Sequence, residues 1–85
     1  MDENWKIFCT NVHSRLKSSI NASIRCNIDD EKDIMYVSIM RLGVNYDMSI
    51  KDISKEIENG EDGIDKCLTK IVNSYRNFIN HKFFY

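Results

Sequence analysis

The sequence predicts one α+β domain in which helices cover a single face of a three-stranded antiparallel β-meander, in the order α-β-β-β-α-α. Two patterns indicate this fold. Three segments between residues 22 and 50 alternate apolar and polar side chains, and the segments on either side repeat apolar residues with helical spacing. A chain of 85 residues can bury one core and leaves little room for an enclosed active site. We therefore expect residues 1–85 to form a single domain.

The sheet is organised around a β-hairpin predicted over residues 34–50. Both strands alternate, and their apolar residues can form three cross-strand pairs on one face, so burial fixes the register. Leu42 is a poor fit to the positive φ of a tight two-residue turn, and we therefore expect a four-residue loop from Arg41 to Val44. The predicted pairs are Met35 with Ile50, Val37 with Met48 and Ile39 with Tyr46.

A first strand is predicted over residues 22–28, and a polar turn over residues 29–33 joins it to the hairpin. Its apolar residues would pair with the same residues of the central strand that face the hairpin partner. A meander of this kind has one apolar face, which helices must cover. The predicted pairs are Ile28 with Met35, Cys26 with Val37 and Ile24 with Ile39.

Helical spacing of apolar residues predicts an amphipathic helix over residues 4–19, a short helix after the sheet that ends at residues 59–60, and a longer helix that runs to about Lys82. Elements from both ends of the chain should therefore share one core with the sheet. The predicted core contains Trp5, Phe8, Leu16, Val37, Ile39, Met48, Leu68, Ile71 and Tyr75.

Three local signals refine these helices. Ser49 with Asp52 resembles a capping box for the short helix, and Asp62 can cap the longer one. Residues 83–85 are too apolar for a free tail, so we expect some of them to dock against the core or a partner.

Composition narrows the class of protein. The chain is 42% hydrophobic and 29% charged with a net charge of −1, which is typical of a globular domain rather than of a disordered or nucleic-acid-binding one. Its apolar runs are too short for a transmembrane helix, and its acidic start is unlike a signal peptide. We expect a cytoplasmic protein without membrane contact.

The residues that could carry chemistry are few and scattered. Cys9, Cys26 and Cys67 are odd in number and contain no C-x-x-C motif, which favours three reduced, packed thiols over a disulfide framework or a zinc site. His13 and His81 lack ligand spacing with cysteines or acids, and the chain has no glycine-rich phosphate loop. We therefore expect no catalysis, no metal and no cofactor.

Charge is distributed unevenly along the chain. Residues 29–65 contain eleven acids and four bases, whereas residues 1–28 and 66–85 are both net basic. The acids of the middle segment can simply cap helices and keep a small domain soluble. Alternatively, they form a surface that engages a basic, nucleic-acid-binding groove on another protein.

The back of the sheet is a second candidate surface, because helices at the two ends of the chain cannot easily cover both faces. Exposed Tyr36 and Met40 beside Asp47 would suit a protein-binding surface, although scattered exposed apolar residues are also common. The residues predicted to face away from the core are Ile34, Tyr36, Met40, Asn45, Asp47 and Ser49.

The order α-β-β-β-α is similar to that of the double-stranded-RNA-binding domain. The last helix lacks the lysine-rich start of that family and opens instead with the acidic segment over residues 60–66, which would repel phosphate. An RNA-binding alternative would use the exposed face of this helix. That face holds Lys66, Lys70, Asn73, Arg76, Asn77 and His81.

The chain is rich in Ile, Asn and Lys, which have A/T-rich codons, and it has an acidic α-β-β-β-α plan. In these respects it resembles small phage and prophage proteins. Among them are anti-CRISPR proteins, which inhibit a Cas nuclease by occupying its DNA-binding groove. The resemblance implies a DNA-mimicking stoichiometric inhibitor of a basic host protein. Independently of the resemblance, the unpaired backbone groups of the edge strands could form a weak homodimer. Nucleic acid is not its expected ligand. The partner-binding residues would be Asp29, Asp30, Glu31, Asp33, Tyr36, Met40, Asp47, Glu56, Glu58, Glu61 and Asp62.

Overall fold

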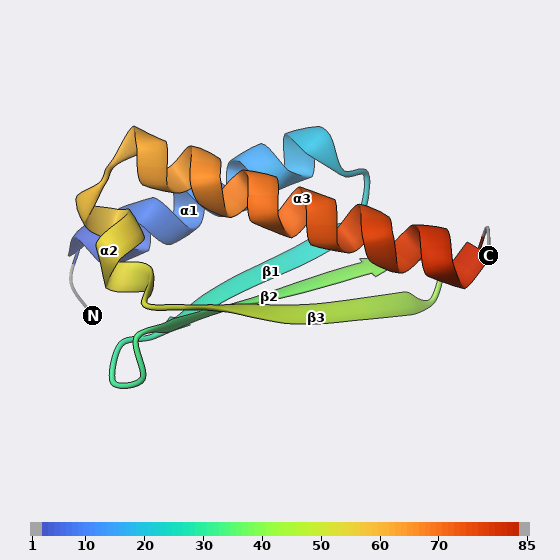
Figure 1. The fold of residues 1–85 in the computed structure, drawn as a ribbon, viewed down its shortest axis with the longest axis horizontal. Helices are drawn as coiled ribbons and strands as arrows, with labels where there is room; N and C mark the ends of the chain where they lie inside the picture. Colours follow the sequence, from blue (N-terminus) through green and yellow to red (C-terminus); the bar gives the residue numbers. More distant parts are fainter. Residues whose placement is uncertain (1–2, 84–85) are drawn as a thin grey trace.

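The molecule has two layers, with the helices packed on one face of a three-stranded antiparallel sheet (Figure 1). The computed structural model describes residues 3–83. The α+β class and the order α-β-β-β-α-α are as predicted. The elements are α1 (Glu3–Ser19), β1 (Ser23–Asp29), β2 (Ile34–Arg41), β3 (Val44–Lys51), α2 (Ile53–Glu58) and α3 (Glu61–Phe83).

The register of the sheet follows from burial, as predicted. Strand β2 lies in the centre and places its apolar residues opposite apolar residues of both neighbours. A slip of one residue would expose one of these apolar sets to water, so the alternation of apolar and polar residues specifies a single register. All six predicted pairs are present: Met35 with Ile28 and Ile50, Val37 with Cys26 and Met48, and Ile39 with Ile24 and Tyr46.

The turn between β2 and β3 differs from the prediction. Arg41 pairs with Val44, so the connection is a two-residue turn, and Leu42 and Gly43 both adopt a positive φ, of 52° and 76°. The expected four-residue loop is therefore wrong. A left-handed leucine costs roughly 1–2 kcal/mol. The eight cross-strand pairs that this register completes outweigh that penalty.

The core lies between the helices and the upper face of the sheet. Of the predicted core, Phe8, Leu16, Val37, Ile39, Ile71 and Tyr75 are buried. The other three predicted residues pack against the core but remain half-buried, because they lie at its margins. These three are Trp5, Met48 and Leu68.

Helix α2 receives its cap from the β1–β2 turn. Asp33 accepts hydrogen bonds from Ser54 N at 2.8 Å and Ser54 Oγ at 2.7 Å. Ser49 lies inside β3, and Asp52 makes no side-chain cap bond, so the predicted capping box is wrong. The reason is that β3 continues to Lys51, which keeps Ser49 in the extended ladder.

Helix α3 starts at Glu61, two residues earlier than a cap at Asp62 would require, so the predicted cap at Asp62 is wrong. Glu61 and Asp62 both lie in its first turn, where their negative charge interacts favourably with the helix dipole. The predicted docking of residues 83–85 concerns side chains outside the part of the chain that the structure describes.

Helices α2 and α3 meet closely at Gly63. A Cβ atom placed on Gly63 would lie 1.8 Å from the backbone oxygen of Glu56, so only glycine permits this approach. This contact fixes the position of α2, which forms a wall of two grooves described below.

The lower face of the sheet is uncovered by helices (Figure 1). The side chains of Tyr36 and Met40 on this face are 42% and 51% exposed. No helix among the described residues is long and apolar enough to cross a membrane.

Candidate protein-binding surfaces

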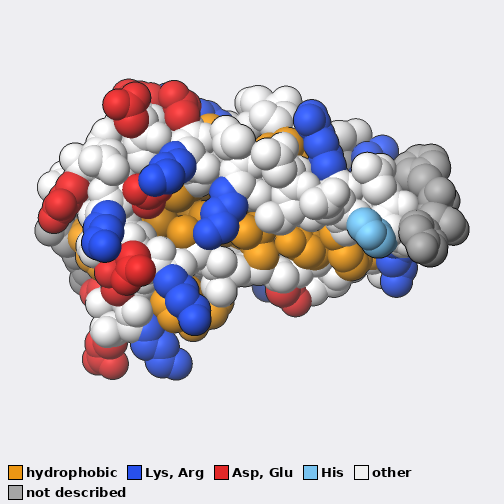
Figure 2. All heavy atoms as spheres, viewed as in Figure 1, with side chains coloured by type: hydrophobic (Ala, Val, Ile, Leu, Met, Phe, Trp, Pro, Cys, Tyr) orange, Lys and Arg blue, Asp and Glu red, His pale blue; other side chains and the backbone are white. Residues whose placement is uncertain are grey.

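The structure gathers the acids of the middle segment at one end of the molecule. The β1–β2 turn, α2 and the start of α3 all lie at this end, and acidic side chains are concentrated there among lysines (Figure 2). Of the acids predicted to bind a partner, Asp47 alone lies elsewhere, on the uncovered face of the sheet.

Several of these acids stabilise the fold itself. Asp33 caps α2, and Asp29 Oδ1 accepts hydrogen bonds from two backbone N–H groups of its own turn. Glu56 lies 3.8 Å from Lys66 Nζ, and Glu61 accepts a 2.6 Å hydrogen bond from Arg15. The capping interpretation therefore explains part of the acidic segment.

Other acids at this end are not used in this way. Asp30, Glu31, Glu58 and Asp62 are exposed, and their carboxylates make neither an ion pair nor a hydrogen bond within residues 3–83. Because their charges are not neutralised by the protein itself, they remain available to a basic partner.

An apolar groove lies beside one of these free acids, Glu58, where α1 faces α2 and the start of α3. We call it the α1–α2 groove. It has a volume of about 740 Å³. Ile7 is 51% exposed, Trp5 and Ile57 are half-buried, and Glu58 and Glu61 lie on its rim.

Sequence reasoning missed the α1–α2 groove. Trp5 belongs to the apolar stripe of its helix and was expected in the core. Two residues could have indicated the groove. Ile7 is an apolar residue outside that stripe, and Ile57 belongs to a helix too short to bury its apolar face fully. Which flank of a helix a neighbour covers depends on packing, and no local pattern encodes it.

The uncovered sheet face forms a separate candidate surface. Asp47 pairs with Ser38. On the same face of β2, Tyr36 precedes Ser38 by two residues and Met40 follows it by two residues, so both lie diagonally across from Asp47. Its carboxylate accepts a 2.8 Å hydrogen bond from Asn45. This face thus combines the two predicted apolar anchors with one of the predicted acids, away from the acidic end.

The basic residues of α3 that would serve an RNA-binding surface are all exposed. Lys66 is close to Glu56, and His81 Nδ1 donates a 2.9 Å hydrogen bond to Asn77 O. These basic residues are therefore accessible along α3, but Glu56 partly neutralises the first of them, Lys66.

The three cysteines are free thiols in different environments. Burial, reinforced by the charge of Glu56, raises the pKa of Cys67 to about 11. A hydrogen bond between the two thiol side chains lowers the pKa of Cys9, and this side-chain interaction together with burial raises the pKa of Cys26. Within residues 3–83, no three His, Cys, Asp or Glu side chains are grouped so that they could hold a metal ion.

Comparison of this chain with models of protein families, with curated proteins and with solved structures gives no match.

Proposed function

We propose that this protein is a non-enzymatic binding module that captures a basic, nucleic-acid-binding protein at its acidic end. The observation that carries the proposal is the α1–α2 groove, which places exposed Ile7 and half-buried Trp5 and Ile57 beside Glu58, an acid that has no internal partner. Apolar anchors surrounded by complementary charge are the usual composition of a protein interface.

The two kinds of side chain would contribute differently. Trp5, Ile7 and Ile57 supply apolar area that a partner can desolvate, which gives affinity. Glu58 and Asp62 supply a negative potential that speeds encounter and selects a basic surface, an effect that weakens as salt rises.

The class of partner follows from charge. A groove that binds nucleic acid is basic, so an acidic protein surface can compete with DNA or RNA for it. Such competition is the action of a phage-encoded inhibitor of a host defence protein such as a Cas nuclease, the class that the sequence resembles. The α+β plan and the acidic end both support this proposal.

Affinity capture from the host cell, with and without added duplex DNA, tests it. We expect the wild-type protein to retain a nucleic-acid-binding protein, identified by mass spectrometry, and DNA to displace it. The double variant Glu58→Lys with Asp62→Lys should lose the partner because it reverses two free charges. Glu61 is left unchanged, since its ion pair with Arg15 joins α3 to α1.

The matched control is Asp47→Lys, which reverses an exposed acid on the uncovered sheet face. It should retain the partner. Capture that survives the double reversal, or that is lost with Asp47→Lys alone, would contradict the assignment to the acidic end.

RNA binding through α3 is the second candidate, supported by the exposed row that includes Lys70 and Arg76. A gel shift with duplex RNA tests it. If this function is correct, Lys70→Ala with Arg76→Ala should abolish the shift, and the Glu58 and Asp62 reversals should strengthen it because they remove repulsion of phosphate.

A further inference from the structure

The two edges of the sheet differ in how their backbone groups are satisfied. Along β1, His13 Nε2 donates a 2.8 Å hydrogen bond to Ile24 O, and Cys9 Sγ donates a 3.3 Å hydrogen bond to Cys26 O. Both donors come from α1, which packs along this strand. Side chains of α1 therefore satisfy two of the outward carbonyl groups of the β1 edge.

The β3 edge has no such cover. Because Arg41 and Val44 flank a two-residue turn, they form a hydrogen-bonded pair, and the pairs to β2 then alternate from Val44 onward. The backbone groups of Asn45, Asp47 and Ser49 consequently point away from the sheet. Within residues 3–83, no hydrogen bond from another element reaches the backbone of this edge.

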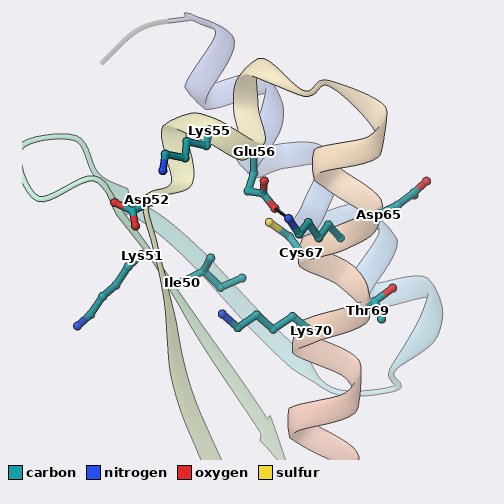
Figure 3. A pocket seen from close by; sticks show the side chains of 10 residues that line it. Ile50, Lys51, Asp52, Lys55, Glu56, Asp65, Cys67, Thr69 and Lys70 are labelled. Atoms are coloured by element: carbon teal, nitrogen blue, oxygen red, sulfur yellow. Dashed lines mark ion pairs between the residues drawn. The ribbon is translucent and has the colours of Figure 1, made fainter.

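A groove runs beside the β3 edge, between β3, α2 and α3, and we call it the β3 groove. Its volume is about 650 Å³, with Ile50 and Cys67 among its lining residues (Figure 3). An apolar stripe follows the line between α3 and β3 on the surface (Figure 2). A strand added to β3 would direct every second side chain into this groove.

The charge of the β3 groove is opposite to that of the acidic end. Lys51, Lys55, Lys66 and Lys70 line it, and Lys70 extends from α3 towards β3 (Figure 3). Of the acids in the lining, Glu56 lies near Lys66, and Asp65 accepts a hydrogen bond from Arg15. The Lys51 side chain points away from α3 (Figure 3). Lys55 and Lys70 are exposed and make no ion pair within residues 3–83, so they add positive charge to the groove.

We propose that the β3 edge is a docking site for an extended segment of a partner protein, with alternating apolar and acidic residues, that adds to the sheet as a fourth strand. Its backbone would bond to Asn45, Asp47 and Ser49, its apolar side chains would enter the β3 groove, and acids near its ends would meet the lysines. A second copy of this chain fits less well, because its own β3 (Val44–Lys51) would offer those lysines a single acid, Asp47. This site lies outside the surface of the proposed function, and neither depends on the other.

The probe is a fluorescein-labelled, capped heptapeptide of alternating glutamate and valine, and a lysine-valine heptapeptide is its matched control. By nuclear magnetic resonance, the acidic peptide should shift the amide signals of Asp47 and Ser49 and slow their hydrogen exchange by at least about tenfold. The amide of Met48, already bonded to β2, should keep its exchange rate. The lysine peptide should do neither.

Charge reversal locates the peptide on the groove. Lys55→Glu with Lys70→Glu should weaken binding about tenfold at low salt, since each exposed ion pair contributes a factor of up to about fivefold. Lys17→Glu, a reversal at the far end of α1, should leave binding unchanged. The proposal is overturned if the acidic peptide fails to bind saturably, if the lysine peptide binds equally well, if protection appears along β1, or if sedimentation shows a dimer that protects Asp47 and Ser49 without peptide.

Discussion

The two grooves on either side of α2 differ in charge, although the chain as a whole is close to neutral. Ser54, Ile57 and Glu58 face the acid-rimmed α1–α2 groove, whereas Lys55 and Glu56 face the lysine-lined β3 groove. A six-residue helix thus separates two surfaces of opposite character. The difference teaches that net charge says little about the partners of a small domain. The arrangement of charges around each apolar opening says more.

Both grooves depend on the same sheet, so a change at its centre should remove them together. Val37 is 1% exposed on the core face of β2. Val37→Asp would bury a charge without a partner and should lower the free energy of unfolding by at least about 3 kcal/mol. Urea denaturation measures this loss. Asn27→Asp, on the uncovered face, is the control and should change stability little; a Val37→Asp variant as stable as wild type would contradict the assigned face.

A change at the α2–α3 contact should disturb both grooves with less effect on the sheet. Gly63→Ala would force a Cβ against Glu56 O and displace α2, at a cost of about 2–3 kcal/mol. Thermal unfolding measures the stability, and amide shifts show whether both walls move. Asp62→Ala, one residue earlier on the exposed side, serves as the control. Equal melting temperatures for the two variants would mean that α2 is not held at this point.

The smallest effect concerns the thiol in the lining of the β3 groove. The pKa of Cys67 is raised from 9.0 to about 11, so the folded protein keeps a proton that the unfolded chain loses. Its contribution to stability is complete below pH 9 and falls as the pH rises towards 11. Between about pH 8 and pH 10, wild type should lose about 1 kcal/mol more than Cys67→Ala. Parallel slopes of the two proteins in urea denaturation would show that Cys67 is not shielded from solvent.

The features that sequence predicted well are those that burial determines over many residues. Alternation in β2 and its neighbours fixed the register, because any slip would expose a whole apolar set. The tight turn at Leu42 could not be predicted from local preference, since its penalty is small beside the pairing that it permits. The cap of α2 by Asp33 joins residues 21 positions apart, which no local motif shows.

The candidate sites were predicted less completely for a similar reason. Charge along the chain indicated an acidic region, and the fold brought most of those acids to one end. Whether an acid is free or neutralised depends on contacts such as Arg15 with Glu61, which come from distant parts of the sequence. The β3 groove combines lysines from β3, α2 and α3, so it exists only in the folded protein.

Binding of two probes to two variants tests most directly whether the grooves act as separate surfaces of opposite charge. The acidic strand peptide and an amphipathic helical peptide of leucine and lysine are titrated, by fluorescence anisotropy, into Glu58→Lys with Asp62→Lys and into Lys55→Glu with Lys70→Glu. We predict that the first variant loses only the basic peptide and the second weakens only the acidic one, each by about tenfold at low salt. If either variant changes the binding of both peptides equally, or if neither changes any, the two grooves are not separate binding surfaces.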